Sequence, residues 1–153
     1  MRRLLKFKCD KDRLEVLVRY DVDRKGGGRD TITLESNEKP SVALIVQFGV
    51  MATHLVAIAE LPSDWIDGLT IVGVTRTITE NGSGLVITGL RELEHQDAPL
   101  CINSPHTTAF SEQCTLDLKE LERLVLRYLD GDERAQLQLH LEEEPSAVLH
   151  GLS

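Results

Sequence analysis

The feature that most constrains the fold is a long segment without charged side chains. No Asp, Glu, Lys or Arg occurs between Lys39 and Glu60. An apolar segment of about 20 residues is long enough to span a bilayer, but Gln47 and His54 interrupt this one. The segment is also too rich in Ala, Leu and Met for a single long strand. We therefore predict that residues 41–61 form a helix buried in the core of the protein.

The prolines at both ends and the spacing of large side chains support this helix. Pro40 stands at the first turn, where its missing N–H costs nothing, and Pro62 ends the segment. Apolar side chains recur at steps of three and four, which places them on one face: Leu44, Phe48, Met51, Leu55 and Ile58. Gln47 and His54 lie on a narrower polar stripe. A ligand pocket is predicted beside these two residues, with a satisfied core histidine as the alternative role of His54.

Length and composition fit a single globular domain. The chain has 153 residues, of which 41% are hydrophobic and 27% charged, as is typical of a globular chain with its own core. We expect one domain over residues 1–131 and a tail over residues 132–153. The net charge of −8 disfavours broad binding to phosphate backbones. Three irregularly spaced cysteines and the lack of an apolar export segment predict a cytoplasmic protein.

Alternation of apolar and polar residues predicts the strands. In the first strand, Leu5, Phe7 and Cys9 would face the core, opposite two lysines. The Asn-Gly-Ser-Gly sequence at 81–84 favours a hairpin turn. Trp65 is expected to pin the preceding turn to the core. The predicted strands cover residues 4–9, 14–22, 31–35, 69–79, 85–93 and 98–103.

A second helix is predicted over residues 115–130, which carry the clearest amphipathic pattern of the chain. Asp117 and Glu120 can form a capping box at its start, and Gly131 can end it. The apolar face comprises Leu118, Leu121, Leu124, Val125, Tyr128 and Leu129. The predicted fold class is α+β. A mainly antiparallel sheet of about six strands would pack on a long buried central helix and a C-terminal amphipathic helix.

Residues with catalytic or metal-binding chemistry lack the spacing that would define a site. His95, Cys101, His106 and Cys114 are zinc-ligand types, but they lack the closely paired spacing of structural zinc sites. No Gly-x-Ser-x-Gly elbow is present. The three glycines at 26–28 lack the Lys-Ser/Thr of a phosphate-binding loop. We therefore expect no enzyme activity, no metal and no cofactor.

The amino-terminal segment is the only basic patch of the sequence. Its cations are Arg2, Arg3, Lys6, Lys8, Lys11 and Arg13. Binding of single-stranded nucleic acid also needs aromatic stacking residues, and only Phe7 and Tyr20 fall on the early strands. A single-stranded nucleic-acid-binding domain is therefore kept as an alternative function. Its binding would be weak and lost at moderate salt.

The tail contains an alternating pattern that does not fit a helix. Leu137, Leu139 and Leu141 alternate with polar residues, which is the period of an extended segment. Such a segment is either an added edge strand of the domain or a peptide that binds another protein through alternate side chains. The pattern leaves both possibilities open.

Residues 136–141 (QLQLHL) resemble the bacterial sliding-clamp-binding motif in its six-residue form, Gln-Leu-x-Leu-x-Leu. Polymerases, repair proteins and replication regulators carry this motif near chain ends. The resemblance implies that Gln136 hydrogen-bonds at the entrance of the clamp pocket and that Leu139 and Leu141 fill it. Leu137 is the fourth matching residue.

Residues 69–136 also resemble small uncharacterised proteins of tailed bacteriophages, through LVITGLREL, APLCINSP and YLDGDERAQ. This resemblance implies a phage origin and a place in the cytoplasm of the host cell. Together the two resemblances imply a non-enzymatic accessory protein that docks on the host replication machinery through its tail. A ligand-binding or inhibitory protein acting against host defence, with a pocket near Gln47 and His54, is the alternative.

Overall fold

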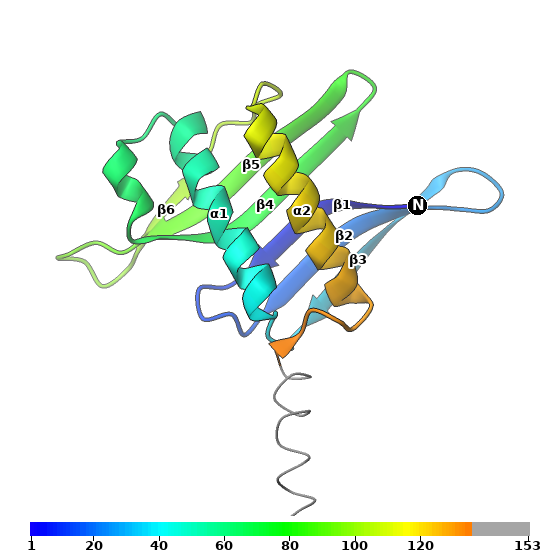
Figure 1. The fold of residues 1–153 in the computed structure, drawn as a ribbon, viewed down its shortest axis with the longest axis horizontal. Coiled ribbons are helices and arrows are strands. Elements are labelled where there is room, and N and C mark those ends of the chain that lie inside the picture. The colour runs from blue at the N-terminus through cyan, green and yellow to red at the C-terminus, as the bar shows by residue number, and fades with distance from the viewer. Residues whose placement is uncertain (136–153) are drawn as a thin grey trace, which may run out of the picture.

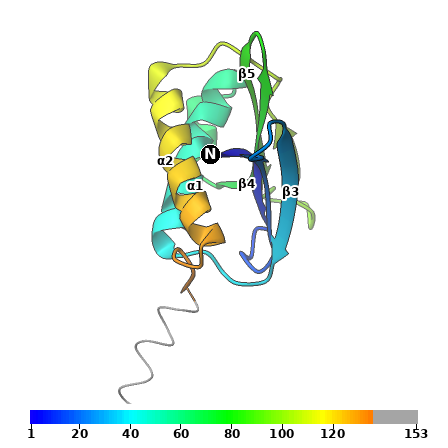
Figure 2. The same ribbon diagram turned by 90° about the vertical axis from the view of Figure 1, so that its right-hand side faces the viewer.

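The computed structural model describes residues 1–135 of the chain. A six-stranded antiparallel sheet carries both helices, α1 (Val42–Ile58) and α2 (Glu112–Leu129), on the same face (Figure 1, Figure 2). The strand order is β3-β2-β1-β4-β5-β6. The remaining elements are β1 (Arg2–Cys9), β2 (Val16–Asp23), β3 (Arg29–Ser36), the short 3-10 helix η1 (Ser63–Ile66), β4 (Leu69–Thr79), β5 (Gly82–Arg91) and β6 (Leu100–Asn103). The predicted α+β class and antiparallel sheet are confirmed.

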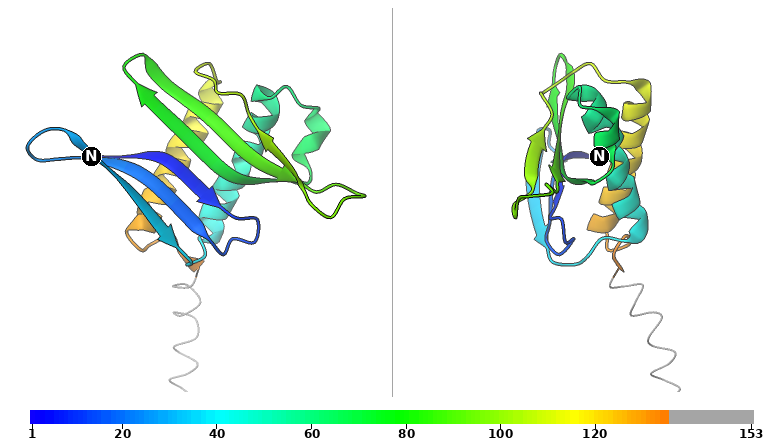
Figure 3. Two further views of the ribbon diagram at one scale, coloured as in Figure 1. Left: turned by 180° about the vertical axis from the view of Figure 1, so that it is seen from behind. Right: turned by 90° about the vertical axis from the view of Figure 1, so that its left-hand side faces the viewer.

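The chain builds this sheet in two similar halves. Each half is a meander of three antiparallel strands followed by a helix, β1-β2-β3-α1 and then β4-β5-β6-α2. The halves meet at a central junction, where β1 lies antiparallel to β4 through the pairs Lys6–Thr75, Phe7–Val74 and Lys8–Gly73. The two helices run in opposite directions across this junction (Figure 1, Figure 3). The arrangement of elements therefore has approximate two-fold symmetry, which no repeat in the sequence indicates.

The core lies between the helices and the sheet. Phe7 from β1 and Phe48 from α1 form an edge-to-face pair, with ring centroids 4.8 Å apart. Both rings are fully buried, together with Leu44, Met51 and Leu55 of the predicted helix face. Aromatic pairs bury large apolar areas and add a specific geometry. The pair therefore fixes the first helix over the centre of the sheet.

Only the inner side of α1 is buried, and it contains most of the apolar face that the sequence predicted. Val42 and Val46 on its outer side are 70% and 61% exposed. The helix begins after its N-cap Ser41 and ends at Ile58 rather than extending to Leu61. No helix within residues 1–135 is long and apolar enough to cross a membrane.

The second helix begins earlier than its amphipathic pattern predicts. Ser111 is the N-cap, and its side chain accepts a hydrogen bond from the main-chain N–H of Cys114 at 3.1 Å. The predicted capping box of Asp117 and Glu120 is wrong, because both residues lie inside the helix. Gly131 follows the helix with φ at +94°, a conformation that glycine adopts without strain. Its predicted role as the terminating glycine is confirmed.

Two apolar side chains lie differently from the prediction. A β-bulge between Leu4 and Lys6 shifts the register of β1, so that Leu4 is buried in place of Leu5. Trp65 does not reach the core, because η1 contains no buried residue. Its ring instead lies 4.0 Å from the guanidinium carbon of Arg91. A cation–π contact therefore holds this corner of the molecule.

Candidate functional site

A polar contact between the helices joins the two residues of the predicted ligand pocket. Nε2 of His54 lies 2.6 Å from Oδ2 of Asp117, and Nε2 of Gln47 donates to the main-chain oxygen of Asp117 at 3.1 Å. The second carboxylate oxygen accepts from Gln113 at 3.0 Å. The side chain of His54 is 8% exposed. Gln47 and His54 therefore fasten α1 to α2, and their shared stripe on α1 was the sequence signal for this contact.

A surface cleft of about 420 Å³ lies beside His54, where α1 ends and α2 begins. Its walls include His54, Ile58, His106, Phe110, Ser111 and Cys114. This volume falls within the usual range for small-molecule sites, roughly 300–1,000 Å³. Gln47 lies outside these walls, so the structure places one of the two predicted pocket residues at a cleft. A second cleft, of about 620 Å³, lies between the β1–β2 turn and the end of β3 and has walls of mixed charge.

The residues considered as zinc ligands do not come together. Within residues 1–135, no three His, Cys, Asp or Glu side chains lie where they could hold a metal ion. Cys101 is exposed on β6, whereas Cys114 is buried in α2. Nε2 of His106 lies 2.9 Å from the hydroxyl oxygen of Thr77. That no metal is bound stays a prediction.

The buried cysteines are not activated as nucleophiles. Burial and, as a smaller cause, the nearby carboxylate of Asp117 together raise the pKa of the Cys114 thiol to about 11. Burial likewise raises the pKa of Cys9. Since the thiolate is the reactive form of cysteine, both side chains remain neutral and unreactive near pH 7.

Among residues 1–135, no element covers the face of the sheet opposite the helices (Figure 2). Phe7, one of the two aromatic residues on the early strands, is buried beneath the helices. Tyr20, the other, packs against the same core. Neither ring is therefore available for base stacking on the open face.

Carboxylates neutralise much of the amino-terminal basic patch. Arg2 forms two hydrogen bonds with Asp130, both of 3.0 Å. Arg3 forms two with Asp21, at 3.1 and 2.8 Å, and Lys11 makes a further ion pair. These contacts reduce the positive charge that could bind phosphates. They support the prediction of weak nucleic-acid binding.

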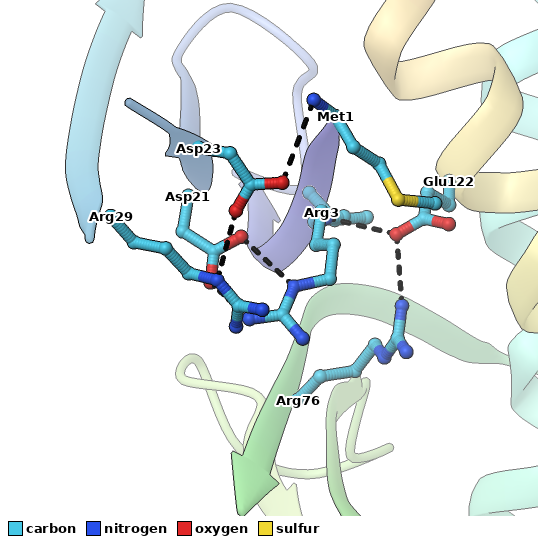
Figure 4. Close-up of polar contacts among 8 residues, drawn as sticks. Met1, Arg3, Asp21, Asp23, Arg29, Arg76 and Glu122 are labelled. Atoms are coloured by element: carbon cyan, nitrogen blue, oxygen red, sulfur yellow. Dashed lines mark hydrogen bonds and ion pairs between the residues drawn. The ribbon is translucent and has the colours of Figure 1, made fainter. Parts of the chain in front are cut away.

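Beyond the central junction, the carboxylate of Glu122 takes the place of a strand partner (Figure 4). The main-chain N–H of Leu4, which has no partner on β4, donates to Oε2 of Glu122 at 2.9 Å. Nη1 of Arg76 on β4 donates to the same oxygen at 2.9 Å. The side chains of Glu122 and Arg76 are 25% and 21% exposed. Glu122 therefore links α2 to both halves of the sheet.

Neighbouring charges in Figure 4 fasten the first strands to one another. The amino group of Met1 lies 3.8 Å from Oδ2 of Asp23, and Nε of Arg29 lies 3.0 Å from Oδ1 of the same residue. Every guanidinium labelled in the figure has a carboxylate partner. The cluster is therefore a structural network rather than an anion site. Sequence reasoning missed it because its members come from four strands and one helix, with no local spacing that relates them.

The end of the described chain is bonded to the domain. An isolated antiparallel bridge pairs Arg134 with Pro40. The main-chain N–H of Ala135 donates to the oxygen of Lys39 at 2.8 Å. The guanidinium carbon of Arg134 also lies 4.5 Å from the ring centroid of Tyr128. The predicted partner-binding residues lie outside the described residues: Gln136, Leu137, Leu139 and Leu141. The first of them, Gln136, directly follows the anchored Ala135.

No protein-family model, curated protein or solved structure matches this chain.

The Glu122→Ala substitution should lower the free energy of unfolding by about 2–3 kcal/mol, because it leaves a partly buried N–H and a guanidinium without their acceptor. Urea unfolding at neutral pH measures this change. Glu120→Ala is the matched control on the same helix. Its partner Arg123 is exposed and three residues away, so this control should leave stability nearly unchanged. Equal effects of the two substitutions would contradict the role assigned to Glu122.

The thiols should differ strongly in reactivity at pH 8. In the folded protein, a thiol reagent should modify Cys101 rapidly and should modify Cys9 and Cys114 only slowly, because both are buried with raised pKa values. Mass spectrometry of peptides after timed quenching measures each site. All three should react in urea. Fast modification of Cys114 in the native state would refute the assigned environment.

Proposed function

We propose that this chain is a non-enzymatic accessory protein that docks on the bacterial sliding clamp through residues 136–141, in the cytoplasm of a bacterial host. The observation that carries the proposal is the match of Gln136, Leu137, Leu139 and Leu141 to the six-residue clamp-binding motif. The resemblance to tailed-phage proteins supports it, because a phage that uses the replication machinery of its host gains from docking there.

The attachment of the chain before the motif adds a geometric argument. The last described main-chain bond, from Ala135 to Lys39, lies one residue before Gln136. Any partner bound to residues 136–141 is therefore held close to the end of the domain that contains Tyr128 and Arg134. The globular domain would then sit directly beside the clamp, where it can act on or obstruct other clamp-bound proteins.

The environment of the reactive side chains supports a docking role over a catalytic one. His54 is bonded to Asp117 between the helices. Cys114 lies beside them with a raised pKa, so its thiol is protonated. A protonated thiol is a weak nucleophile, and the side chain of His54 is only 8% exposed. Both features suit structural residues better than nucleophilic or general-base catalysis.

The cleft beside His54 favours a second candidate function, a ligand-binding or inhibitory protein that acts against host defence. The cleft has the volume of a small-molecule site. It is bounded by apolar side chains and by two imidazoles, those of His54 and His106. Such walls suit a ligand with an apolar body and a few hydrogen-bonding groups.

A ligand of this cleft should raise the melting temperature of the protein. Small-molecule fractions of bacterial extract are the probes, and a ligand at 100 times its dissociation constant adds about 2.7 kcal/mol of stability. Ile58→Trp fills the cleft from α1 and should abolish the shift, whereas Thr33→Trp, at an exposed position of β3, should retain it. Extracts that shift neither the wild type nor the control would exclude this second candidate.

For the clamp, we expect a dissociation constant of order micromolar, about 8 kcal/mol, because a linear peptide loses chain entropy on binding. Burial of a leucine side chain contributes about 1.5–3 kcal/mol. Leu139→Ala should therefore weaken binding roughly tenfold or more. Gln136→Ala should cost a similar amount if its amide is desolvated and paired. Calorimetric titration of purified clamp with the full-length chain measures both.

His140→Ala is the matched control, because position 140 is a variable position of the motif. It should leave the affinity within a factor of about two, less than 0.5 kcal/mol. A thermal melt of each variant distinguishes the alternative role as an edge strand. If the leucines belong to the core, Leu139→Ala lowers the melting temperature by several degrees and the wild type gives no heat with clamp. That pair of results would reject the proposed function.

A further inference from the structure

The outer side of α1 is an uncharged stripe that faces solvent. From Ser41 to Ala59 the helix and its caps contain no charged residue. The stripe consists of the exposed residues Val42, Val46, Gly49, Val50, Thr53 and Ala57. A helix that is apolar all round is normally buried on all sides. Within residues 1–135, nothing covers this side of α1.

The second helix shows that the position itself does not require an apolar surface. α2 has the equivalent place in the other half of the fold and packs on the same face of the sheet (Figure 1, Figure 2). Its outer residues include Lys119, Glu120, Arg123 and Arg127, and they are charged as expected for a helix in water. The same location therefore carries a solvent-adapted surface in one half and an apolar stripe in the other.

We propose that this stripe is the interface of a homodimer, in which α1 packs antiparallel against α1 of a second copy. The two-fold axis passes beside Gly49 and Val50. This proposal is independent of the clamp-binding function, because the stripe and residues 136–141 are different parts of the chain.

The order of side chains along the stripe makes it complementary to itself. The first half presents the bulky Val42 and Val46, and the second half presents the small Thr53 and Ala57. Antiparallel packing about the midpoint places Val46 opposite Thr53 and Val42 opposite Ala57 of the second copy. Large side chains then meet small ones in both copies, which is how closely packed layers interdigitate. The opposed helix dipoles also favour this orientation.

Gly49 at the midpoint supports a close approach of two helices. Glycine inside a helix costs about 1 kcal/mol relative to alanine, so it needs a reason to be there. A Cβ added at Gly49 would meet no atom within 4 Å, so packing inside one copy does not supply that reason. Close approach of the backbone of a second copy at this position would explain the glycine.

Charge and size also favour a second copy. With a net charge of −8, two chains repel one another over most of their surface, and an uncharged stripe is where they can approach. The stripe is about 24 Å long at 1.5 Å per residue, and a standard interface buries roughly 800 Å² of each partner. The contact therefore extends onto α2, where Leu116 is 52% exposed and its charged neighbours form a polar rim.

Sedimentation velocity of the full-length chain from about 1 to 100 µM tests the proposal, a range that brackets a micromolar dissociation constant. The wild type should change from monomer to dimer across this range. Val46→Glu and Gly49→Leu should remain monomeric at every concentration without a loss of melting temperature, because both positions are exposed. Thr33→Glu adds the same charge on the open face of the sheet and should still dimerise. A wild type that is monomeric throughout, or a dimer that survives Val46→Glu, overturns the proposal.

Disulfide trapping tests the antiparallel register in a Cys101→Ser background, which removes the exposed native thiol. Val50→Cys lies beside the axis and should cross-link to its own copy on mild oxidation. Val42→Cys should not, because two such residues would be about 22 Å apart along the helices, beyond the reach of a disulfide. A mixture of Val42→Cys and Ala57→Cys chains should cross-link. Self-cross-linking of Val42→Cys, or no cross-link from Val50→Cys, would refute this geometry.

Discussion

The central junction between β1 and β4 carries the connection between the two halves of the protein. Within residues 1–135, these strands pair through three residue pairs, fewer than either strand forms with its other neighbour. Phe7 lies in the middle of the junction and packs edge-to-face on Phe48 of α1. Where the pairing stops, Glu122 of α2 accepts hydrogen bonds from both sides. The helices therefore help to hold the two halves of the sheet together, because the pairing of β1 with β4 extends over only a short length.

The same arrangement explains why the contact between the helices is polar at one point. Each helix packs over the sheet by apolar side chains, and the position of one helix along the other also depends on the polar contact between them. The hydrogen bonds of His54 and Gln47 with Asp117 are directional and set that position. Through these hydrogen bonds the two residues serve the fold, while the cleft beside His54 remains open to a ligand.

The surfaces left over by this architecture fit the proposed role in binding other proteins. Three of the six amino-terminal cations, Arg2, Arg3 and Lys11, are paired with carboxylates, and the buried thiols are neutral. In our proposals, the uncharged stripe of α1 binds a second copy and residues 136–141 bind the clamp. A dimer formed through the stripe would present two copies of the segment that we propose binds the clamp, and linked sites bind more tightly than single ones when the geometry allows both to engage.

The sequence by itself determined the element types, their order and most of the core, because these depend on the local periods of apolar residues. Leu44 and Leu55 in α1 and Leu121 and Tyr128 in α2 are buried as their spacing predicts. Tertiary structure decided features that depend on residues far apart in the chain. The bulge that buries Leu4 follows from pairing with β2, and the role of Glu122 exists only where α2 crosses the end of the junction. The sequence likewise left the exposure of Val42 and Val46 undetermined. An uncharged helix has the same sequence pattern whether its outer side is covered by the same chain or by a second molecule.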